Sequence, residues 1–365
     1  MKARLFLAGA VMSVLAACGT SSNAQHSTAA ASTTVPSAQL RGQTVRLLTH
    51  DAFAVSKSVL AAFTAQTGVK VQVLRQGDAG AMVNAAILTR DHPQADVLYG
   101  VDTTFVSRAL DHRLFAPRAY RGLDRLSAAA RSSVPGGSGY VVPVDFGDVC
   151  LNLDRPWFDR HPSVPMPTRI GDLVDPRYRS LTVVENPASS SPGLAFVLAT
   201  IERFGDGWTR YWQQLRRNDV LVADSWTTAY ESDFSAGGGK GTRPIVVSYA
   251  SSPPADVVYA EDGRTAPHVT AVTDGCFRQY EYAGVLHGAA HPDAGQLLVE
   301  YLVGPQFQAD MPLQMYVFPT RIGTPLPSVF ERFAVVPPAP ESMAPARITR
   351  NRDDWISQWT AIVAG

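Results

Sequence analysis

Apolar and polar positions along residues 44–110 form short blocks that predict strands and helices in turn. Residues 44–50, 69–74 and 95–101 have the length and apolar content of strands in a buried sheet. Residues 53–67, between the first two, carry apolar side chains at helical spacing, and Gly68 follows where a left-handed helix C-cap belongs. Strands that alternate with helices predict a parallel sheet with helices on both faces.

Two later segments, 140–153 and 277–286, also have strand-like patterns, and the first is interrupted at residues 145–147. They flank one compact α/β unit, so we expect the chain to leave one lobe, build a second and return through a two-stranded hinge. Lobes joined in this way close over a ligand held between them. The predicted fold class is α/β, with two lobes and two crossing hinge strands. Further elements are predicted as a strand at 244–248 and helices at 80–90, 192–204, 208–217, 292–303 and 353–363.

The first residues predict an extracytoplasmic location. Lys2 and Arg4 precede 13 uncharged, mostly apolar residues, 5–17, which are too few to span a bilayer but suit a signal peptide. This stretch runs into LAAC, which resembles the bacterial lipobox, where cleavage leaves a lipid-carrying cysteine at the new N-terminus. We therefore expect a signal peptide at 1–17, lipidation of Cys18 and anchoring to the bacterial cell membrane. The alternative is ordinary cleavage beside an incidental cysteine.

Residues 18–43 are predicted to form a flexible tether. Of the 24 residues in 19–42, 14 are Ser, Thr or Ala, and Arg41 carries the one charge. This composition offers too little apolar area to offset the entropy of ordering the chain. About 320 residues follow, enough for one large or two medium domains. We divide them into lobe 1, residues 44–144 plus 277–365, and lobe 2, residues 145–276.

Charge and cysteine content exclude two classes of protein. The chain has 32 basic and 32 acidic residues, and removal of Lys2 and Arg4 with the signal peptide leaves 30 against 32, a net charge of −2. That balance argues against nucleic acid as a partner. Apart from Cys18, the cysteines are Cys150 and Cys276, too few for a cysteine-rich zinc site. Outside the cytoplasm we expect a disulfide between them, with two buried free thiols as the alternative.

A series of short motifs follows a recognisable order and spacing from about residue 44 to residue 363. The motifs are THDAF (49–53), GDAG (77–80), ADVLYGVD (95–102), PVDFG (143–147), SSPGL (190–194), DSWTTAY (224–230), SYASSP (248–253), MYVFP (315–319) and WISQW (355–359). Together they resemble the thiamine-binding substrate-binding proteins of ABC importers. The resemblance implies the two-lobed periplasmic-binding-protein type II fold. It also implies a monomer without cofactor or catalytic residues that delivers thiamine, a thiamine phosphate or a pyrimidine precursor to a membrane permease with its ATPase.

The resemblance also implies the ligand site. Trp226 and Tyr249 fall on positions where rings stack on the ligand, and the alternative for each is core packing. Asp51 and Asp78 follow predicted strands, where an open α/β sheet presents ligand groups to a partner such as a thiazolium. Ser190 starts a predicted helix, so we expect it both to cap that helix and to contact the ligand. The implied set is completed by His50, Gly80 and Tyr316.

Two further carboxylates also lie near predicted strand ends, Asp102 and Asp145. Asp102 precedes a predicted helix, so a helix cap is its first interpretation. For the other carboxylates, a cap, a hinge hydrogen bond or a surface charge is the alternative to ligand contact.

Four positions depart from the family pattern. His50 and Ala255 stand where relatives carry Tyr, and Lys57 and Tyr316 stand where they carry Trp. Three of these changes remove or shrink aromatic surface. A lysine at position 57, if it faces the ligand, would favour a phosphate or another anion over a thiazolium.

Two other functions are weighed against this one. A related importer subunit for ferric iron would need hard oxygen donors, often paired tyrosines. In this motif, Tyr249 follows Ser248 and no second tyrosine stands beside it. A secreted hydrolase could use cleft carboxylates as acid and base. Acidic pairs are common in clefts, so we expect a binding protein rather than an enzyme, and no metal site.

Overall fold

The computed structural model describes residues 37–136, 139–238 and 240–363. The predicted signal peptide, the lipidation site Cys18 and most of the predicted tether lie outside the described residues. Helix α1 (Ser37–Leu40) occupies the last part of that tether, and Leu40 is buried. The folded body therefore begins before residue 44.

Within the described residues, nine strands form one sheet in the order β2-β1-β3-β8-β4-β7-β5-β6, with β9 paired to β4. The pairs of β1 with β2 and β3, and of β5 with β6 and β7, are parallel, whereas β4 and β8 are antiparallel to their neighbours. This confirms the predicted α/β class. The strands are β1 (Thr44–Thr49), β2 (Lys70–Arg75), β3 (Val97–Asp102), β4 (Val142–Asp154), β5 (Thr182–Glu185), β6 (Leu221–Ala223), β7 (Ile245–Tyr249), β8 (Val269–Val285) and β9 (Phe318–Pro319).

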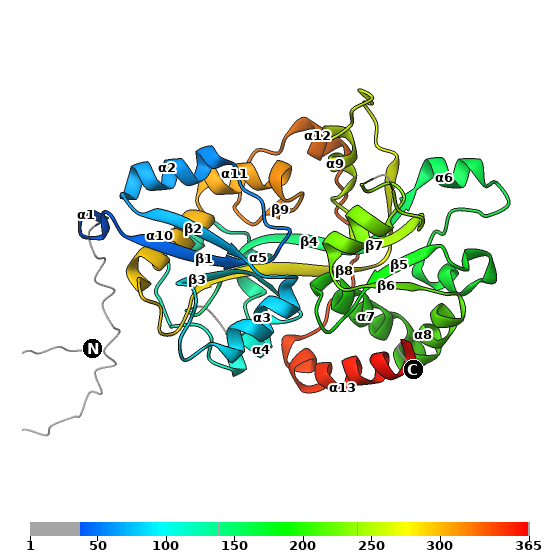
Figure 1. Ribbon diagram of the computed structural model, residues 1–365, viewed down its shortest axis with the longest axis horizontal. Coiled ribbons are helices and arrows are strands. Elements are labelled where there is room, and N and C mark those ends of the chain that lie inside the picture. The colour runs from blue at the N-terminus through cyan, green and yellow to red at the C-terminus, as the bar shows by residue number, and fades with distance from the viewer. Residues whose placement is uncertain (1–36, 137–138, 239, 364–365) are drawn as a thin grey trace, which may run out of the picture. The chain divides into compact units, whose positions relative to one another are not determined.

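Helices cover both faces of the sheet (Figure 1). In β3, Val97 and Tyr99 belong to one apolar cluster with α10 and α11, while Leu98 and Val101 belong to another with α3 and α4. Alternation from Val97 to Tyr99, and a register shift between Tyr99 and Val101, distribute the side chains of β3 over these two layers. The helices are α2 (Lys57–Thr67), α3 (Ala79–Leu88), α4 (Val106–Asp111), α5 (Ala128–Ser132), α6 (Arg155–Arg160), α7 (Ser191–Phe204), α8 (Trp208–Arg217), α9 (Pro253–Val258), α10 (Pro292–Leu302), α11 (Pro305–Gln314), α12 (Ser328–Phe333) and α13 (Pro345–Val363).

The long strands β4 and β8 lie at the centre of the sheet and pair from Val142 opposite Ala283 to Asp154 opposite Val269. The predicted interruption of the first strand at 145–147 is wrong, because register shifts absorb the irregularity and β4 runs through it. The predicted start of the second strand at residue 277 is also wrong: β8 begins at Val269, through a stretch whose Thr, Asp and Gly residues resemble a loop. The lobe boundaries stay a prediction.

Two side-chain links join β4 to β8. Cys150 and Cys276 form a disulfide with an S–S distance of 2.02 Å. Beside it, the Arg278 guanidinium donates two hydrogen bonds to the buried Asp148 carboxylate, at 2.5 and 2.9 Å. Burial raises the pKa of Asp148, and the hydrogen bond and charge of Arg278 oppose that rise. The central strands are therefore fastened covalently and by a shielded ion pair.

The first helical block begins later than predicted. Helix α2 begins at Lys57 rather than at residue 53, because Phe53 is buried in the turn before it and Ser56 takes the N-cap position. The Ser56 hydroxyl donates to Asp310 at 2.5 Å, which ties this end to α11. At the other end Gly68 has φ 74°, which confirms the predicted left-handed C-cap.

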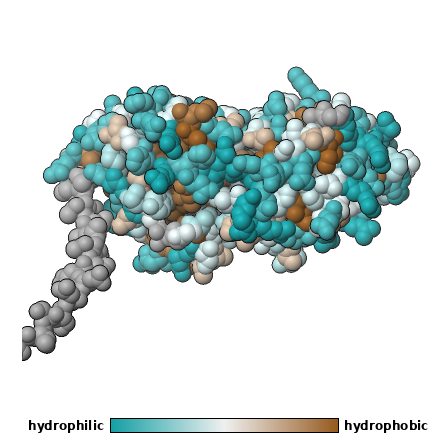
Figure 2. Space-filling model, turned by 90° about the horizontal axis from the view of Figure 1, so that it is seen from below, coloured by the Kyte–Doolittle hydropathy of each residue, from teal (hydrophilic) through white to brown (hydrophobic). Residues whose placement is uncertain are grey.

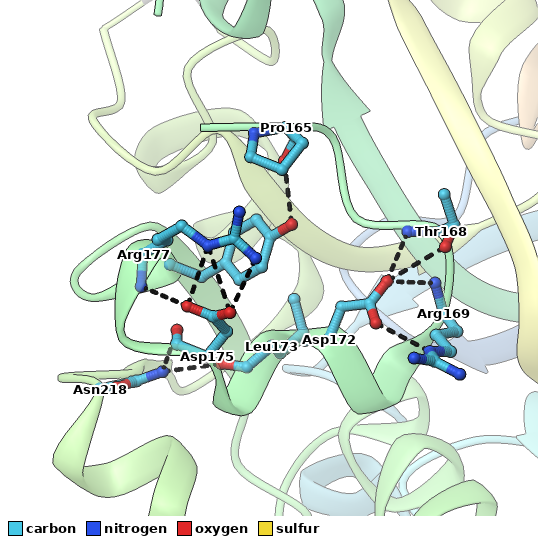
Figure 3. A network of polar contacts seen from close by, with 9 residues as sticks. Pro165, Thr168, Arg169, Asp172, Leu173, Asp175, Arg177 and Asn218 are labelled. Carbon is cyan, nitrogen blue, oxygen red and sulfur yellow. Dashed lines mark hydrogen bonds and ion pairs between the residues drawn. The ribbon is translucent and has the colours of Figure 1, made fainter. Parts of the chain in front are cut away.

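Polar contacts hold the segment between α6 and β5 (Figure 3). Asp172 accepts hydrogen bonds from the backbone and hydroxyl of Thr168 and from Arg169. Asn218 donates to the carbonyls of Leu173 and Asp175, both at 2.8 Å. This network fixes a loop-rich edge that has little apolar pattern of its own.

The face seen in Figure 2 is mostly hydrophilic, with small separate apolar patches. In the described ranges, no helix is both long and apolar enough to cross a membrane.

Candidate ligand-binding site

A cavity of about 510 Å³ opens among side chains from both sides of the central β8–β4 pair. Its volume lies within the range of small-molecule sites in proteins. Six of the eight residues that the sequence predicts as ligand contacts line it. They are His50, Asp51, Asp78, Trp226, Tyr249 and Tyr316.

Aromatic rings form one wall of the cavity. The Trp226 ring stacks on Tyr230 with centroids 5.0 Å apart and an interplanar angle of 16°. Its indole N–H donates to the Ser248 hydroxyl at 2.9 Å, which fixes the plane of the ring. Tyr249 donates to the Gln279 side-chain oxygen at 3.1 Å. Gly147 makes room for that ring, since a Cβ there would lie 2.7 Å from Tyr249 Cδ1.

Two more tyrosines of the cavity lining contact each other. The rings of Tyr259, at the end of α9, and Tyr316, before β9, lie 5.9 Å apart in an edge-on arrangement. Tyr316 has φ 54°, a strained conformation for a residue with a side chain. Tyr259 is 69% exposed, and the sequence prediction missed it. Its one available signal is its position four residues after Ala255, which also lines the cavity.

The charged groups of the lining are almost all acidic. Among the described residues, the lining contains four carboxylates and one imidazole but neither lysine nor arginine. Lys57 is exposed at the start of α2 and does not line the cavity. The lining therefore suits a cation better than an anion. The carboxylates belong to Asp51, Asp78, Glu231 and Glu281.

Asp78 links two elements at the cavity. It is the N-cap of α3, where one carboxylate oxygen accepts from the Ala79 N–H at 2.6 Å, and its other oxygen accepts from the Trp226 backbone N–H at 2.9 Å. Burial raises the pKa of Asp78, and these hydrogen bonds partly oppose the rise. Behind it lies Glu185, whose oxygens have no hydrogen-bond partner among the described residues. Burial, and then Asp78, hold the pKa of Glu185 well above its usual value.

His50 and Glu281 face each other in the lining, with His50 Nε2 3.5 Å from Glu281 Oε2. Burial lowers the pKa of His50, whereas Glu281 and the more distant Asp78 and Asp51 raise it. Their combined effect is the larger, so the pKa of His50 lies above 6.5. The sequence prediction missed Glu281, because the residues around it in β8 are buried on both faces and no alternation singles it out.

Gly80 and Ser190 do not line the cavity. Gly80 serves close packing, since a Cβ there would lie 2.6 Å from the Phe105 ring and 2.8 Å from the Ser189 carbonyl. Ser190 is fully buried at the N-cap of α7 and its side chain makes no cap hydrogen bond, contrary to the capping prediction. The next two residues, Ser191 and Pro192, line the cavity instead.

Asp102 and Asp145 also lie outside the lining and are fully buried. Asp102 accepts from the Thr104 hydroxyl at 2.8 Å and from the Gln279 amide at 2.5 Å, and burial raises its pKa to about 7. It does not cap α4, whose N-cap is Phe105. Asp145 accepts from the Tyr99 hydroxyl at 2.5 Å.

The pattern of the bacterial extracellular solute-binding proteins matches residues 92–352. The chain belongs to this family. The solute-binding protein is 26% identical over 322 residues to the thiamine-binding periplasmic protein of Escherichia coli, across 87% of this chain and 92% of the relative. It is 28% identical over 338 residues to the protein of the same name from Brucella suis, across 89% and 93%.

Solved structures of low identity share the fold. A periplasmic thiamin binding protein superposes with a TM-score of 0.77 at 24% identity, across 88% of this chain and 98% of that one. Iron-bound HitA from Pseudomonas aeruginosa superposes with a TM-score of 0.67 at 19% identity, across 88% and 99%. These neighbours confirm the predicted periplasmic-binding-protein fold. Membership in the family gives the protein an extracytoplasmic solute-binding role.

Proposed function

We propose that the protein binds thiamine and delivers it to an ABC importer. The observation that carries the proposal is a cavity walled by aromatic rings and lined by four carboxylates, with neither lysine nor arginine among its described lining. Thiamine combines flat heterocycles with a permanent positive charge. Aromatic faces and carboxylates attract such a cation when water is excluded. The names of the Escherichia coli and Brucella suis relatives support the same ligand.

The charged residues of the lining indicate which form of thiamine should bind most tightly. A phosphate group on the ligand needs N–H donors and gains from positive charge. Lys57, the cation that could have supplied it, is exposed outside the cavity. We therefore place thiamine ahead of its phosphates, and both ahead of a pyrimidine precursor that lacks the thiazolium.

Ferric iron is the main alternative, since a neighbour of the same fold binds iron. A phenolate ligand must lose its proton. Burial, together with Glu281 and Asp102, holds the pKa of Tyr249 well above its ordinary value of 10.0. Its hydroxyl is also engaged with Gln279. These contacts favour an organic cation over iron. Use of the carboxylates for hydrolysis is a weaker alternative, because the family consists of binding proteins.

Delivery follows from the family rather than from the cavity. We propose that the protein is a monomer held to the cell membrane by lipid on Cys18. In its closed form it would dock on a permease whose cytoplasmic ATPase drives transport.

Isothermal titration calorimetry of the purified protein tests the proposal. Thiamine, thiamine monophosphate, thiamine diphosphate and ferric citrate are titrated in parallel, and bound ligand is recovered for mass spectrometry. We expect saturable binding of thiamine, weaker binding of the diphosphate and unchanged ligand after recovery. Binding of ferric citrate with a coloured ferric–phenolate band, or a hydrolysed ligand, would replace this function with one of the alternatives.

A further inference from the structure

Among the described residues of the cavity lining, buried side-chain atoms of His50, Glu281 and Tyr316 make no hydrogen bond, and those of His50 and Glu281 lie together. His50 Nε2 and Glu281 Oε2 are buried, and neither makes a hydrogen bond to another residue in the part of the chain that the structure describes. Their side chains are only 10% and 12% exposed, and both line the cavity. Buried polar groups in native proteins are normally hydrogen-bonded. These two atoms face each other as an ion pair at 3.5 Å but make no hydrogen bond, which points to a ligand in the cavity that completes them.

The backbone holds this pair in place. Gly100 has φ 97°, and a Cβ at that position would lie 2.3 Å from His50 Cδ2, so glycine lets the imidazole lie against β3. Glu281 is opposite Asp102 on β3 and opposite Asp145 on β4 in the sheet register. Acidic neighbours thus surround Glu281, and His50 is the basic group that faces it.

The two atoms have complementary chemistry. A carboxylate oxygen accepts a hydrogen bond, and an imidazole N–H donates one. Lying 3.5 Å apart, they can be reached together by one edge of a flat heterocycle. An exocyclic amine beside a ring nitrogen presents the matching donor and acceptor. Carboxylates read the amino group of cytosine in the same way.

We infer that His50 and Glu281 form the specificity pair that reads the aminopyrimidine edge of the ligand. Glu281 accepts from the exocyclic amine, and His50 donates to the adjacent ring nitrogen. The inference rests on the proposed function, because the aminopyrimidine is the part of thiamine that carries this edge. It adds a discrimination that stacking and charge alone do not supply, since these tolerate any flat cation.

Oxythiamine tests the inference, because it keeps both rings and the positive charge but replaces the amine with oxygen. Calorimetry compares thiamine and oxythiamine on the wild-type protein, on Glu281→Gln and on Glu231→Gln. We expect the wild type to prefer thiamine by about 10- to 100-fold, the discrimination typical of one well-matched base-edge contact. Glu281→Gln should bind oxythiamine more tightly than the wild type does, since the new amide N–H can donate to the ligand oxygen.

Glu231→Gln is the matched control. It removes another lining carboxylate by the same chemical change, so it should weaken both ligands together and leave their ratio unchanged. At the partner position, His50→Gln keeps an N–H donor and should retain the preference that His50→Leu loses. The gain in oxythiamine affinity cannot come from misfolding.

The outcomes separate the two proposals. Equal affinity of the wild type for thiamine and oxythiamine, or an equal loss of both in Glu281→Gln, overturns the specificity pair and leaves thiamine binding intact. Absence of thiamine binding by the folded wild type overturns the proposed function and the pair with it.

Discussion

Replacement of Trp226 by alanine removes one aromatic wall of the cavity with little disturbance elsewhere. The Ser248 hydroxyl that accepts from the indole keeps a second partner, Ser252, at 3.0 Å. The hydrogen bond to Asp78 comes from the backbone of residue 226 and survives the substitution. A desolvated cation over an aromatic face is stabilised by about 2 kcal/mol, which corresponds to a loss of roughly 30-fold in thiamine affinity.

Titration calorimetry on three variants checks this loss. Trp226→Phe keeps an aromatic face and should retain most of the affinity. Trp157→Ala removes a half-buried tryptophan of α6 that stacks on His161 away from the cavity, so it controls for general effects of losing an indole. If Trp226→Ala has the same thermal unfolding temperature as the wild type, yet its affinity for thiamine is within about threefold of the wild-type affinity, the ring does not contact the ligand.

Three further predictions follow from contacts outside that wall. Tyr259→Ala should weaken thiamine binding about tenfold, because bound ligand would cover the exposed ring of Tyr259. Tyr140→Ala is the control, since the Tyr140 ring is exposed away from the cavity and its loss should leave the affinity unchanged. Equal calorimetric affinities of the two variants for thiamine would contradict this prediction. Asp102 has a pKa of about 7 against 3.8, so the folded state holds its proton more tightly. This group therefore lowers the free energy of unfolding as pH rises from about 4 to 7, by up to roughly 4 kcal/mol. In urea unfolding, Asp102→Asn should lack this part of the loss, and pH profiles parallel to those of the wild type would refute the cause. Joint replacement of Cys150 and Cys276 by alanine should lower the free energy of unfolding, measured with urea, by roughly 4–5 kcal/mol, because the disulfide closes a loop between residues 126 positions apart. An unchanged urea midpoint of unfolding would rule out that contribution.

The sequence predicts the regular parts of the fold because local patterns determine them. Helix α8 has the predicted bounds, and the Gly68 cap lies where expected, since each depends on side chains within a few turns. The start of β8 could not be predicted, because its polar half is held by pairing with β4, far away in the chain. Long-range pairing of this kind leaves no periodic signal in the strand itself.

Some residues of the candidate site could be predicted from local motifs, and others could not. Trp226 and Tyr249 were predicted through the motifs around them, and both line the cavity. Glu281 and Tyr259 carry no motif, and only the fold brings them to the same cavity. Ser190 shows the converse: its motif is matched, but the first turn of α7 directs Ser191 to the cavity and buries Ser190.

The central claim is that the cavity selects a cation through aromatic faces and carboxylates. Calorimetry with thiamine and with its neutral deaza analogue, in which carbon replaces the charged ring nitrogen, tests it most directly, because the two ligands share shape and pyrimidine edge. We predict that thiamine binds about 30-fold more tightly, the contribution of about 2 kcal/mol expected for a desolvated cation. Equal affinities for the two ligands would contradict recognition of charge in this cavity.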